Sequence, residues 1–333
     1  MIINFNLQNT GAGNNGGTAT LFHSANVLEE LGHHVNVVSD IENYFTWFKL
    51  KGATFIKAYG SDYPDADVNV ATGAGSVKHV LKAPRSKGKK FWWIRGHETW
   101  IATAEDLLIR YKQPKIQKMV NSECLRRFIK RTTGKNLPVI RPGLDFDVFH
   151  RTVTRDWLNK KEIVIGALYT ERPSKRFKWL PYICKGLKNS GIDYRFKIFG
   201  TWEDPIGLEY DEYLEKPSPK KLSEFYNSID FWIAPTKTEG LHMPPQEAML
   251  CGCVVIGAVG ELNGMNDYIE HEETGFLVNH PDDVLSILKR FHGDKVYRGE
   301  VAQKSVAGTY KVLSLGDRRT NMQLMVDHFK RTE

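Results

Sequence analysis

APTKTEGLHMPPQEAMLCGCVVIGAVGELNGM, residues Ala234–Met265, is the stretch that decides the fold class of this chain. It begins inside the apolar run DFWIAP (230–235) and places Glu239 eight residues before Glu247. EGLH predicts a turn, and PQEAML predicts a helix with proline early in it, where proline is tolerated. A second apolar run, CVVIGA (253–258), follows at once. Strand, loop, helix and strand in this order are typical of an α/β fold with a parallel sheet.

The same alternation of apolar runs and amphipathic stretches occurs along the whole chain, in two series separated by a polar segment near residues 150–161. We interpret that segment as a linker. The sequence therefore predicts an N-terminal Rossmann-like domain over 1–150 and a C-terminal one over 162–312, facing each other across a central cleft. A helix within 313–333 is expected to pack back on the N-terminal domain through Leu324, Met325 and Phe329.

Composition excludes several classes of protein. The length of 333 residues suits two domains, and the 41% hydrophobic content is ordinary for a globular protein. The four cysteines form no C-x-x-C pair and no histidine cluster has metal-ligand spacing, so we expect no metal site and reduced thiols. No signal peptide or membrane-spanning run is visible. We expect a cytoplasmic protein, with peripheral attachment to the inner face of the membrane left open.

Positive charge is concentrated in one region. The chain carries a net charge of +7, yet residues 78–141 contain 17 Lys/Arg and 4 Asp/Glu, a local charge of +13. Within it, LRRFIKRTTGK (125–135) reads as a basic amphipathic helix. This region predicts an anionic partner, namely a lipid surface, a phosphorylated acceptor or nucleic acid. The alternative is a solvated basic face without a partner.

The two carboxylates of the deciding stretch suit a nucleotide sugar. Glu239 lies on a loop after a strand and Glu247 in the first turns of the next helix, so both can face the crevice where α/β sheets bind ligands. One carboxylate can accept hydrogen bonds from ribose hydroxyls and the other from a hexose, at ~1.5–3 kcal/mol for each charged acceptor. The backbone amides around the helix start can bind a diphosphate; these belong to Gly240, Leu241, His242 and Met243.

E-G-L-H-M-P-P-Q-E-A-M-L-C-G-C-V-V resembles the E-x7-E signature of the family-4 retaining glycosyltransferases, which have the GT-B fold. SPKKLSEFYNSIDFWIAPT (218–236) and GFLVNHPDDVLSIL (275–288) resemble the same family in register. The resemblance implies a retaining, metal-independent hexosyltransferase without a cofactor. Its donor is a nucleoside-diphosphate sugar, with UDP-sugar favoured, and its acceptor hydroxyl lies on a glycan or lipid-linked molecule.

The resemblance also assigns roles to single residues. In IGALYTERPSKRFKWLPYI (165–183), Lys175 matches the Lys that binds the diphosphate, whereas the place of the family's Arg is taken by Ala167. Arg172 is expected to substitute for it from the loop. His97, in WWIRGHETW, matches a histidine that bonds the transferred sugar, so that His97, Glu239 and Lys175 form the expected catalytic set. His242 replaces a Gly, and whether it touches the sugar or only adjusts the loop stays open.

A glycine-rich stretch near the N-terminus leaves an alternative of another class. NTGAGNNGGTATLF (9–22) contains G-x-G-x-x-G, and Asp40 ends the next apolar run, as in an NAD-dependent oxidoreductase. By resemblance, Gly16 and Gly17 instead lie near the donor diphosphate and the acceptor. Further alternatives are a glycosyltransferase acting on a modified nucleic-acid base and a non-catalytic nucleotide-sugar-binding protein. The donor base, the sugar, the linkage and the oligomeric state are not encoded in any motif we recognise.

Overall fold

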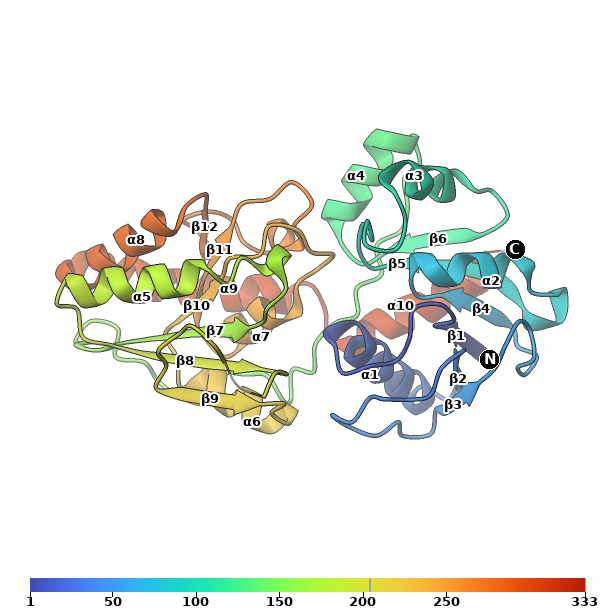
Figure 1. The fold of residues 1–333 in the computed structure, drawn as a ribbon, viewed down its shortest axis with the longest axis horizontal. Helices are drawn as coiled ribbons and strands as arrows, with labels where there is room; N and C mark the ends of the chain where they lie inside the picture. Colours follow the sequence, from blue (N-terminus) through green and yellow to red (C-terminus); the bar gives the residue numbers. More distant parts are fainter. Residues whose placement is uncertain (204, 333) are drawn as a thin grey trace. The chain divides into compact units, whose positions relative to one another are not determined.

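The computed structural model describes residues 1–203 and 205–332, which form two compact units (Figure 1). Unit 1 comprises Met1–Gly143 and Gly316–Glu333, and unit 2 comprises Leu144–Leu315. The expected domain 162–312 includes position 204 and the expected segment 313–333 includes position 333; these two positions lie outside the described residues.

Unit 1 is built on a parallel six-stranded sheet in the order β3-β2-β1-β4-β5-β6. Its strands are β1 (Ile2–Asn6), β2 (His34–Ser39), β3 (Thr54–Lys57), β4 (Val68–Ala71), β5 (Lys89–Ile94) and β6 (Gln117–Val120). The strand order reverses direction between β1 and β4. In such sheets, ligands bind outside the carboxyl ends of the strands at this switch point.

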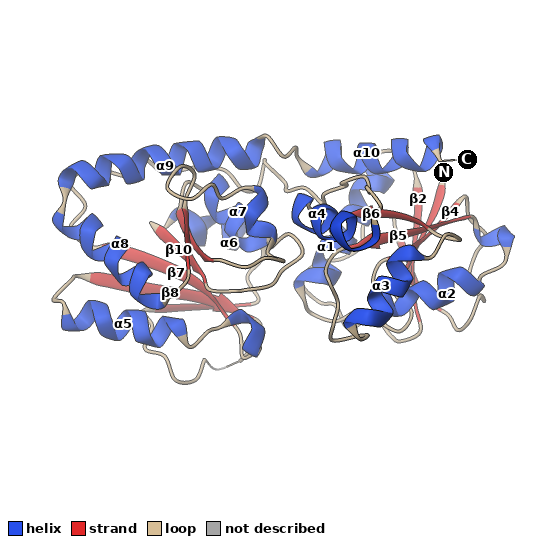
Figure 2. Ribbon diagram, turned by 90° about the horizontal axis from the view of Figure 1, so that it is seen from above, coloured by secondary structure: helices blue, strands red, loops and turns tan. Residues whose placement is uncertain are grey.

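Helices cover both faces of this sheet. One core contains side chains of α1 (Gly16–Glu30) and α10 (Arg318–Arg331), and a second core contains those of α2 (Val77–Lys82), α3 (Ala104–Lys112) and α4 (Glu123–Thr133). Short 3-10 turns are η1 (Ala74–Ser76) and η2 (Arg85–Lys87). The chain thus returns to its N-terminal unit, as the fold prediction has it, and both ends lie there (Figure 2).

Helix α10 packs through a stripe slightly different from the expected one. Met325 and Phe329 are buried, but Leu324 is 48% exposed, which corrects the prediction for that residue. The buried stripe is completed by Met322 and Val326, at the i, i+3, i+4, i+7 spacing of one helix face. It packs in the same core as α1, whose Asn15 cap accepts a hydrogen bond from the Thr18 amide at 2.9 Å.

Unit 2 repeats the architecture with the order β12-β11-β10-β7-β8-β9, again all parallel. Its strands are β7 (Ile163–Tyr169), β8 (Tyr194–Gly200), β9 (Glu212–Glu215), β10 (Phe231–Ala234), β11 (Val254–Ala258) and β12 (Phe276–Val278). The switch point lies between β7 and β10, so the loops that follow these two strands meet at the ligand-binding end of the sheet.

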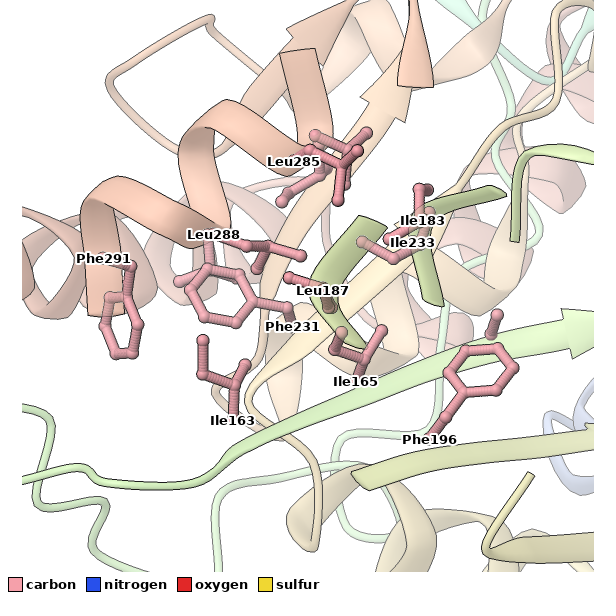
Figure 3. Packing of buried hydrophobic residues seen from close by; sticks show 14 of the residues in the cluster. Ile163, Ile165, Ile183, Leu187, Phe196, Phe231, Ile233, Leu285, Leu288 and Phe291 are labelled. Atoms are coloured by element: carbon pink, nitrogen blue, oxygen red, sulfur yellow. The ribbon is translucent and has the colours of Figure 1, made fainter. Parts of the chain in front are cut away.

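The two faces of this sheet are covered by different helices. One face packs on α5 (Trp179–Asn189) and α8 (Pro281–Gly293), where Ile165 and Phe231 of the strands lie among Leu187 and Leu288 (Figure 3). The other packs on α6 (Pro219–Asn227) and α7 (Met243–Leu250), and α9 (Lys295–Leu313) contributes to both cores. Turns η3 (Pro173–Lys175) and η4 (Gly264–Asp267) complete the unit. Each buried aliphatic or aromatic side chain contributes ~1.5–3 kcal/mol.

The linker expected near residues 150–161 is instead a packed part of unit 2. The Arg155 guanidinium donates to the carbonyl oxygens of Tyr226, Ile229 and Cys251 at 2.7–3.0 Å. Trp157 is 6% exposed and packs in the core with Phe231. The Arg155 side chain therefore hydrogen-bonds to backbone carbonyl groups near strand and helix ends and does not face water.

No helix among the described residues has both the length and the apolar character that crossing a bilayer demands.

Candidate functional site

The strongest cluster of predicted site residues lies at the β7–β10 switch point of unit 2. Arg172 and Lys175 follow β7, and Lys175 ends the turn η3. Glu239 stands on the loop after β10, and Glu247 lies one turn into α7. The structure thus brings these four residues to the carboxyl ends of adjacent strands, which pair in parallel through Phe231–Ile165, Trp232–Gly166 and Ile233–Ala167.

Lys175 and Glu239 form an ion pair across this switch point. Their side chains are 20% and 24% exposed, so the pair is only partly screened by water. Burial, and secondarily the positive charge of Arg172, lower the pKa of Lys175 from 10.5 to about 8. The adjacent Glu239 carboxylate favours the charged form of Lys175, and we treat the ammonium as charged at neutral pH.

The loop that carries Glu239 is held by its own backbone. The Glu239 amide donates to the Leu262 carbonyl oxygen at 2.9 Å, and the Gly264 amide donates to the Glu239 carbonyl oxygen at 3.0 Å. The fully buried Asn263 side chain donates to the carbonyl oxygens of Thr236 and Ala258 at 2.8 and 3.1 Å. These bonds join the loops after β10 and β11 and fix the position of the carboxylate.

Close backbone approach makes glycine necessary at the contact between these two loops. A Cβ atom at Gly264 would lie 2.4 Å from the Gly240 carbonyl oxygen, and one at Gly260 would lie 1.9 Å from that of Lys237. Real Cβ atoms do not approach backbone so closely. The two glycines of GELNG (260–264) thus let the loop after β11 pack directly against the backbone of the loop after β10.

Glu247 accepts a hydrogen bond from a buried tyrosine. The Tyr226 hydroxyl of α6 donates to Glu247 Oε2 at 2.9 Å, and Tyr226 is fully buried. Burial and the neighbouring carboxylate raise the pKa of Tyr226, so its hydroxyl stays protonated and remains a donor. This hydrogen bond to one carboxylate oxygen orients the Glu247 side chain.

The turn before α7 offers an anion site of backbone amides. The amides of Gly240, Leu241 and His242 donate to no acceptor among residues 1–203 and 205–332. Pro244 and Pro245 follow and carry no amide hydrogen, so the helix start itself supplies fewer donors than expected. The predicted amide site therefore rests on the turn, where His242 adopts φ +61°.

Arg172 adds a second cation near Lys175. It is exposed, and within the described part of the chain it has no acidic partner in ion-pair range. Its guanidinium nevertheless contributes to lowering the pKa of Lys175, which requires the two positive charges to be near each other. Arg172 and Lys175 thus give this end of the sheet two positive side chains near the turn 240–242.

In unit 1, Gly16 and Gly17 open α1 directly after the Asn15 cap. Arg95, which follows β5, donates to the Gly17 carbonyl oxygen at 2.6 Å and to that of Thr72 at 3.0 Å. This guanidinium joins the loops after β1 and β4, the switch point of the unit 1 sheet. It sets the geometry of the glycine turn that the sequence singles out.

His97 lies in the loop after β5 and is oriented by two helices. Its Nδ1 is 3.2 Å from the Tyr111 hydroxyl of α3, and its ring contacts Phe128 of α4 edge-on. Tyr111 is fully buried, and among the described residues its hydroxyl pairs with His97 Nδ1. This contact holds the imidazole ring in either tautomer of its neutral form. Burial lowers the pKa of His97, which favours this neutral form.

Asp40 has a structural partner. Both of its carboxylate oxygens accept a hydrogen bond from the Asn9 amide at 3.0 Å. The loop between β1 and α1 spans residues 7–15, and Asp40 closes it. This contact gives Asp40 a role in the loop and leaves a ribose-binding role without structural support.

Two other features of the described residues bear on the chemistry. Groups of three or more His, Cys, Asp or Glu side chains able to hold a metal ion are absent from the searched residues 1–203 and 205–332. A hollow of about 420 Å³ lies at the amino ends of β7 and β8, lined by Lys160, Glu162 and Arg195 among others. Its charges pair with one another, as in Arg195–Glu162 at 2.6 Å, so it is a weaker ligand site than the switch point.

Four residues that organise the site were missed from the sequence. They are Arg95, Tyr111, Tyr226 and Asn263, and each acts through a partner more than ten residues away in the chain. Tyr226 stands within the quoted stretch SEFYNS, but no spacing rule links it to Glu247. Buried tyrosine and arginine in α/β sequences are common core residues, which is why sequence reasoning passed over them.

Part of unit 2 matches a family of known proteins. Residues 159–292 match the family model described as "Glycosyl transferases group 1", and these residues contain the whole unit 2 cluster. Over 127 residues, the chain is 28% identical to an uncharacterized glycosyltransferase of Haemophilus influenzae. This match covers 36% of the chain and about a third, 35%, of the length of that relative.

Solved structures share the fold over the full length. A glycosyltransferase from Rickettsia africae aligns over 100% of this chain and 99% of its own, with a TM-score of 0.77 and 13% identity. Anabaena HepE, crystallised with UDP-glucose, aligns over 99% of both chains, with a TM-score of 0.71 and 14% identity. By sequence, residues 159–292 match the group 1 glycosyl transferases, and by fold the chain is a GT-B protein.

Proposed function

We propose that this chain is a glycosyltransferase that moves a hexose from a nucleoside-diphosphate sugar to an acceptor hydroxyl. The observation that carries the proposal is the Lys175–Glu239 pair at the β7–β10 switch point, beside Glu247, within the segment that matches the group 1 model. UDP-sugar is the favoured donor because the HepE structures contain UDP and UDP-glucose.

Each residue of the unit 2 cluster has a role in this proposal. Glu247, held by Tyr226, accepts hydrogen bonds from the ribose hydroxyls. Lys175, Arg172 and the free amides of 240–242 stabilise the diphosphate, on which negative charge builds as the sugar bond breaks. Glu239 orients Lys175 in the free protein and accepts hydrogen bonds from the hexose in the complex.

We propose that transfer proceeds with retention and without a metal ion. In this proposal Lys175 and Arg172, whose positive charges lie near each other, supply the charge stabilisation that a metal ion would otherwise give to the diphosphate. In a retaining reaction without a protein nucleophile, the leaving phosphate accepts the proton of the acceptor hydroxyl as the new bond forms on the same face. His97 is predicted to bond the transferred sugar through its Nε2.

The acceptor is proposed to be a glycan or a lipid-linked molecule bound by unit 1. Helix α4 buries Leu125 and Ile129 and exposes Arg127, Lys130 and Arg131. A basic face of this kind attracts an anionic surface and weakens with salt. Cytoplasmic location with peripheral attachment to the inner membrane face remains part of the proposal.

The direct test is donor turnover. The wild-type chain is incubated with UDP-glucose, UDP-galactose, UDP-N-acetylglucosamine, GDP-mannose and ADP-glucose, with and without EDTA, and release of the nucleoside diphosphate is measured. We expect slow release to water from one donor, unchanged by EDTA, with the first sugar product in the anomeric configuration of the donor by NMR. Inverted product contradicts retention, and loss of release in EDTA contradicts metal independence. Absence of both binding and release for every donor contradicts the proposed function.

A further inference from the structure

The His242 side chain is buried, and one of its ring nitrogens makes no hydrogen bond to the described residues. It is 7% exposed, and its Nδ1 has no hydrogen-bond partner among the described residues. A buried polar atom normally has a partner, so the unpaired Nδ1 of a residue in this turn calls for an explanation.

The backbone of His242 is held by hydrogen bonds, whereas the buried Nδ1 of its ring has no hydrogen-bond partner among the described residues. The buried Tyr268 hydroxyl donates to the His242 carbonyl oxygen at 2.8 Å, and the Gln246 side chain donates to the same oxygen at 3.4 Å. His242 also adopts φ +61°, a conformation that favours glycine. Placing a side chain here is therefore unfavourable for the turn itself, and a ligand contact explains its presence.

The imidazole at this position is neutral. Burial, and secondarily the charge of Lys175, lower the pKa of His242 well below its ordinary value of 6.5. His242 stands three residues after Glu239, which pairs with Lys175, one of the cations proposed to hold the diphosphate. A neutral imidazole keeps one nitrogen lone pair as an acceptor.

The neighbours of His242 distinguish a sugar from a phosphate as its partner. Lys175, Arg172 and the free amides of 240–242 supply hydrogen-bond donors, which suit phosphate oxygens. Glu239 is the charged acceptor beside them, and the neutral ring of His242 adds a second acceptor. An additional neutral acceptor has no role toward a phosphate, which lacks protons to donate near neutral pH, but it suits a sugar hydroxyl.

We infer that His242 is a specificity-determining residue that accepts a hydrogen bond from a hydroxyl of the donor hexose. This inference rests on the proposed function and adds the group that separates a nucleotide sugar from the bare nucleoside diphosphate. In this inference the amides of the turn bind the diphosphate, and the His242 ring forms a hydrogen bond with the sugar attached to it.

The test compares dissociation constants of His242→Gly with those of wild type. Calorimetry is run with the five nucleotide sugars named above, each against its own UDP, GDP or ADP. Glycine suits the positive φ, so the variant is expected to fold, and His242→Asn provides a second variant that tolerates φ > 0. Glu272→Gly is the matched control, because Glu272 is exposed and has φ +64° away from the site.

For the nucleotide sugar that binds wild type, we expect His242→Gly to weaken binding about tenfold, the loss of one hydrogen bond, and to change nucleoside-diphosphate binding less than about twofold. Glu272→Gly is expected to change neither. Equal weakening of sugar and diphosphate complexes, or unchanged sugar binding in both His242 variants, overturns the inference while leaving the proposed function intact. If wild type binds none of the nucleotides, the proposed function fails and this inference fails with it.

Discussion

Lys175 and Glu239 form an ion pair that links the loops after β7 and β10, the two strands at which the unit 2 sheet reverses its order. Neither partner is fully buried, and the lysine is also near the unpaired cation Arg172. A more highly charged anion can therefore displace the Glu239 carboxylate from Lys175. A diphosphate with two or more negative charges is such an anion.

The first prediction is that nucleoside-diphosphate affinity falls as the pH rises above 8. The pKa of Lys175 in the free protein is about 8, and a bound anion favours the protonated ammonium and raises that pKa. Above pH 8 the free protein must take up a proton to bind, so the dissociation constant rises by up to about tenfold per pH unit. Calorimetry between pH 7 and 9.5 measures this, because the phosphate itself ionises near pH 6.

Lys175→Arg is the control for this pH dependence. Arginine keeps its charge throughout the range, so affinity in the variant is expected to stay flat from pH 7 to 9.5. The same steep decline in wild type and variant would assign the titration to another group, such as Lys118, whose pKa burial also lowers to about 8.

The second prediction concerns the coupling of Glu247 and Tyr226. Glu247→Ala removes a charged acceptor and is expected to weaken nucleoside-diphosphate binding by about ten- to a hundredfold. Tyr226→Phe removes only the hydroxyl that orients Glu247 at 2.9 Å, so its effect should be smaller. Titration of a nucleoside diphosphate into wild type, both single variants and the double variant gives the four dissociation constants of a double-mutant cycle.

In this cycle the double variant is expected to bind no worse than Glu247→Ala, because Tyr226 acts on the ligand only through Glu247. Strict additivity of the two losses would mean that the hydroxyl of Tyr226 affects binding by another route, and the assigned role of the pair would be wrong.

The third prediction is that Tyr111 acts through His97. Tyr111→Phe keeps the ring that stacks on Trp92 but loses the hydroxyl bonded to His97 Nδ1. We expect kcat to fall about tenfold with the donor KM nearly unchanged, and no further loss when the substitution is made in His97→Ala. Steady-state kinetics of the four proteins test this.

Tyr63→Phe is the matched control for Tyr111. Tyr63 is also buried in unit 1, and its hydroxyl accepts from the Asn69 side chain at 2.9 Å, away from His97. Its variant should retain kcat. If Tyr63→Phe lowers kcat as much as Tyr111→Phe, the effect is general loosening of the unit rather than orientation of His97.

The fourth prediction concerns the glycine contact between the loops after β10 and β11. Gly264→Ala would place a methyl group 2.4 Å from the backbone of Gly240 and Leu241, so the two loops must separate. We expect a lower melting temperature and a loss of nucleoside-diphosphate affinity of at least tenfold. At Gly293 a Cβ atom meets nothing within 4 Å, so Gly293→Ala is expected to keep the wild-type melting temperature and nucleoside-diphosphate affinity. Normal ligand binding in Gly264→Ala would show that the loop contact does not position the site.

The fold was predictable from the sequence because its signals are local. The run CVVIGA became β11 and the run MIINFNL contains β1, since buried parallel strands are continuous apolar stretches. The position of Glu239 after a strand and of Glu247 in a helix followed from the same pattern together with EGLH and two prolines. These residues lie at the switch point because strand order determines which loops become neighbours.

Other features depend on contacts between distant residues and were not predictable. The charged segment 150–161 has the composition of a solvated linker, but Arg155 binds carbonyl oxygens up to 96 residues away. Leu324 and Met322 are equally apolar, and only the direction of α10 on its sheet decides which is buried. Tyr226 and Asn263 act by hydrogen bonds whose partners the chain brings together only on folding.

The most direct test of the central claim is thermal stabilisation of wild type and Glu247→Ala by UDP, GDP, ADP, CDP and NAD. A ligand at about 100 times its dissociation constant adds ~2.7 kcal/mol to the free energy of unfolding. The account predicts that one nucleoside diphosphate stabilises wild type and that Glu247→Ala loses this response. Stabilisation of both proteins by NAD alone would contradict it and would place the nucleotide site at the glycine-rich turn of unit 1.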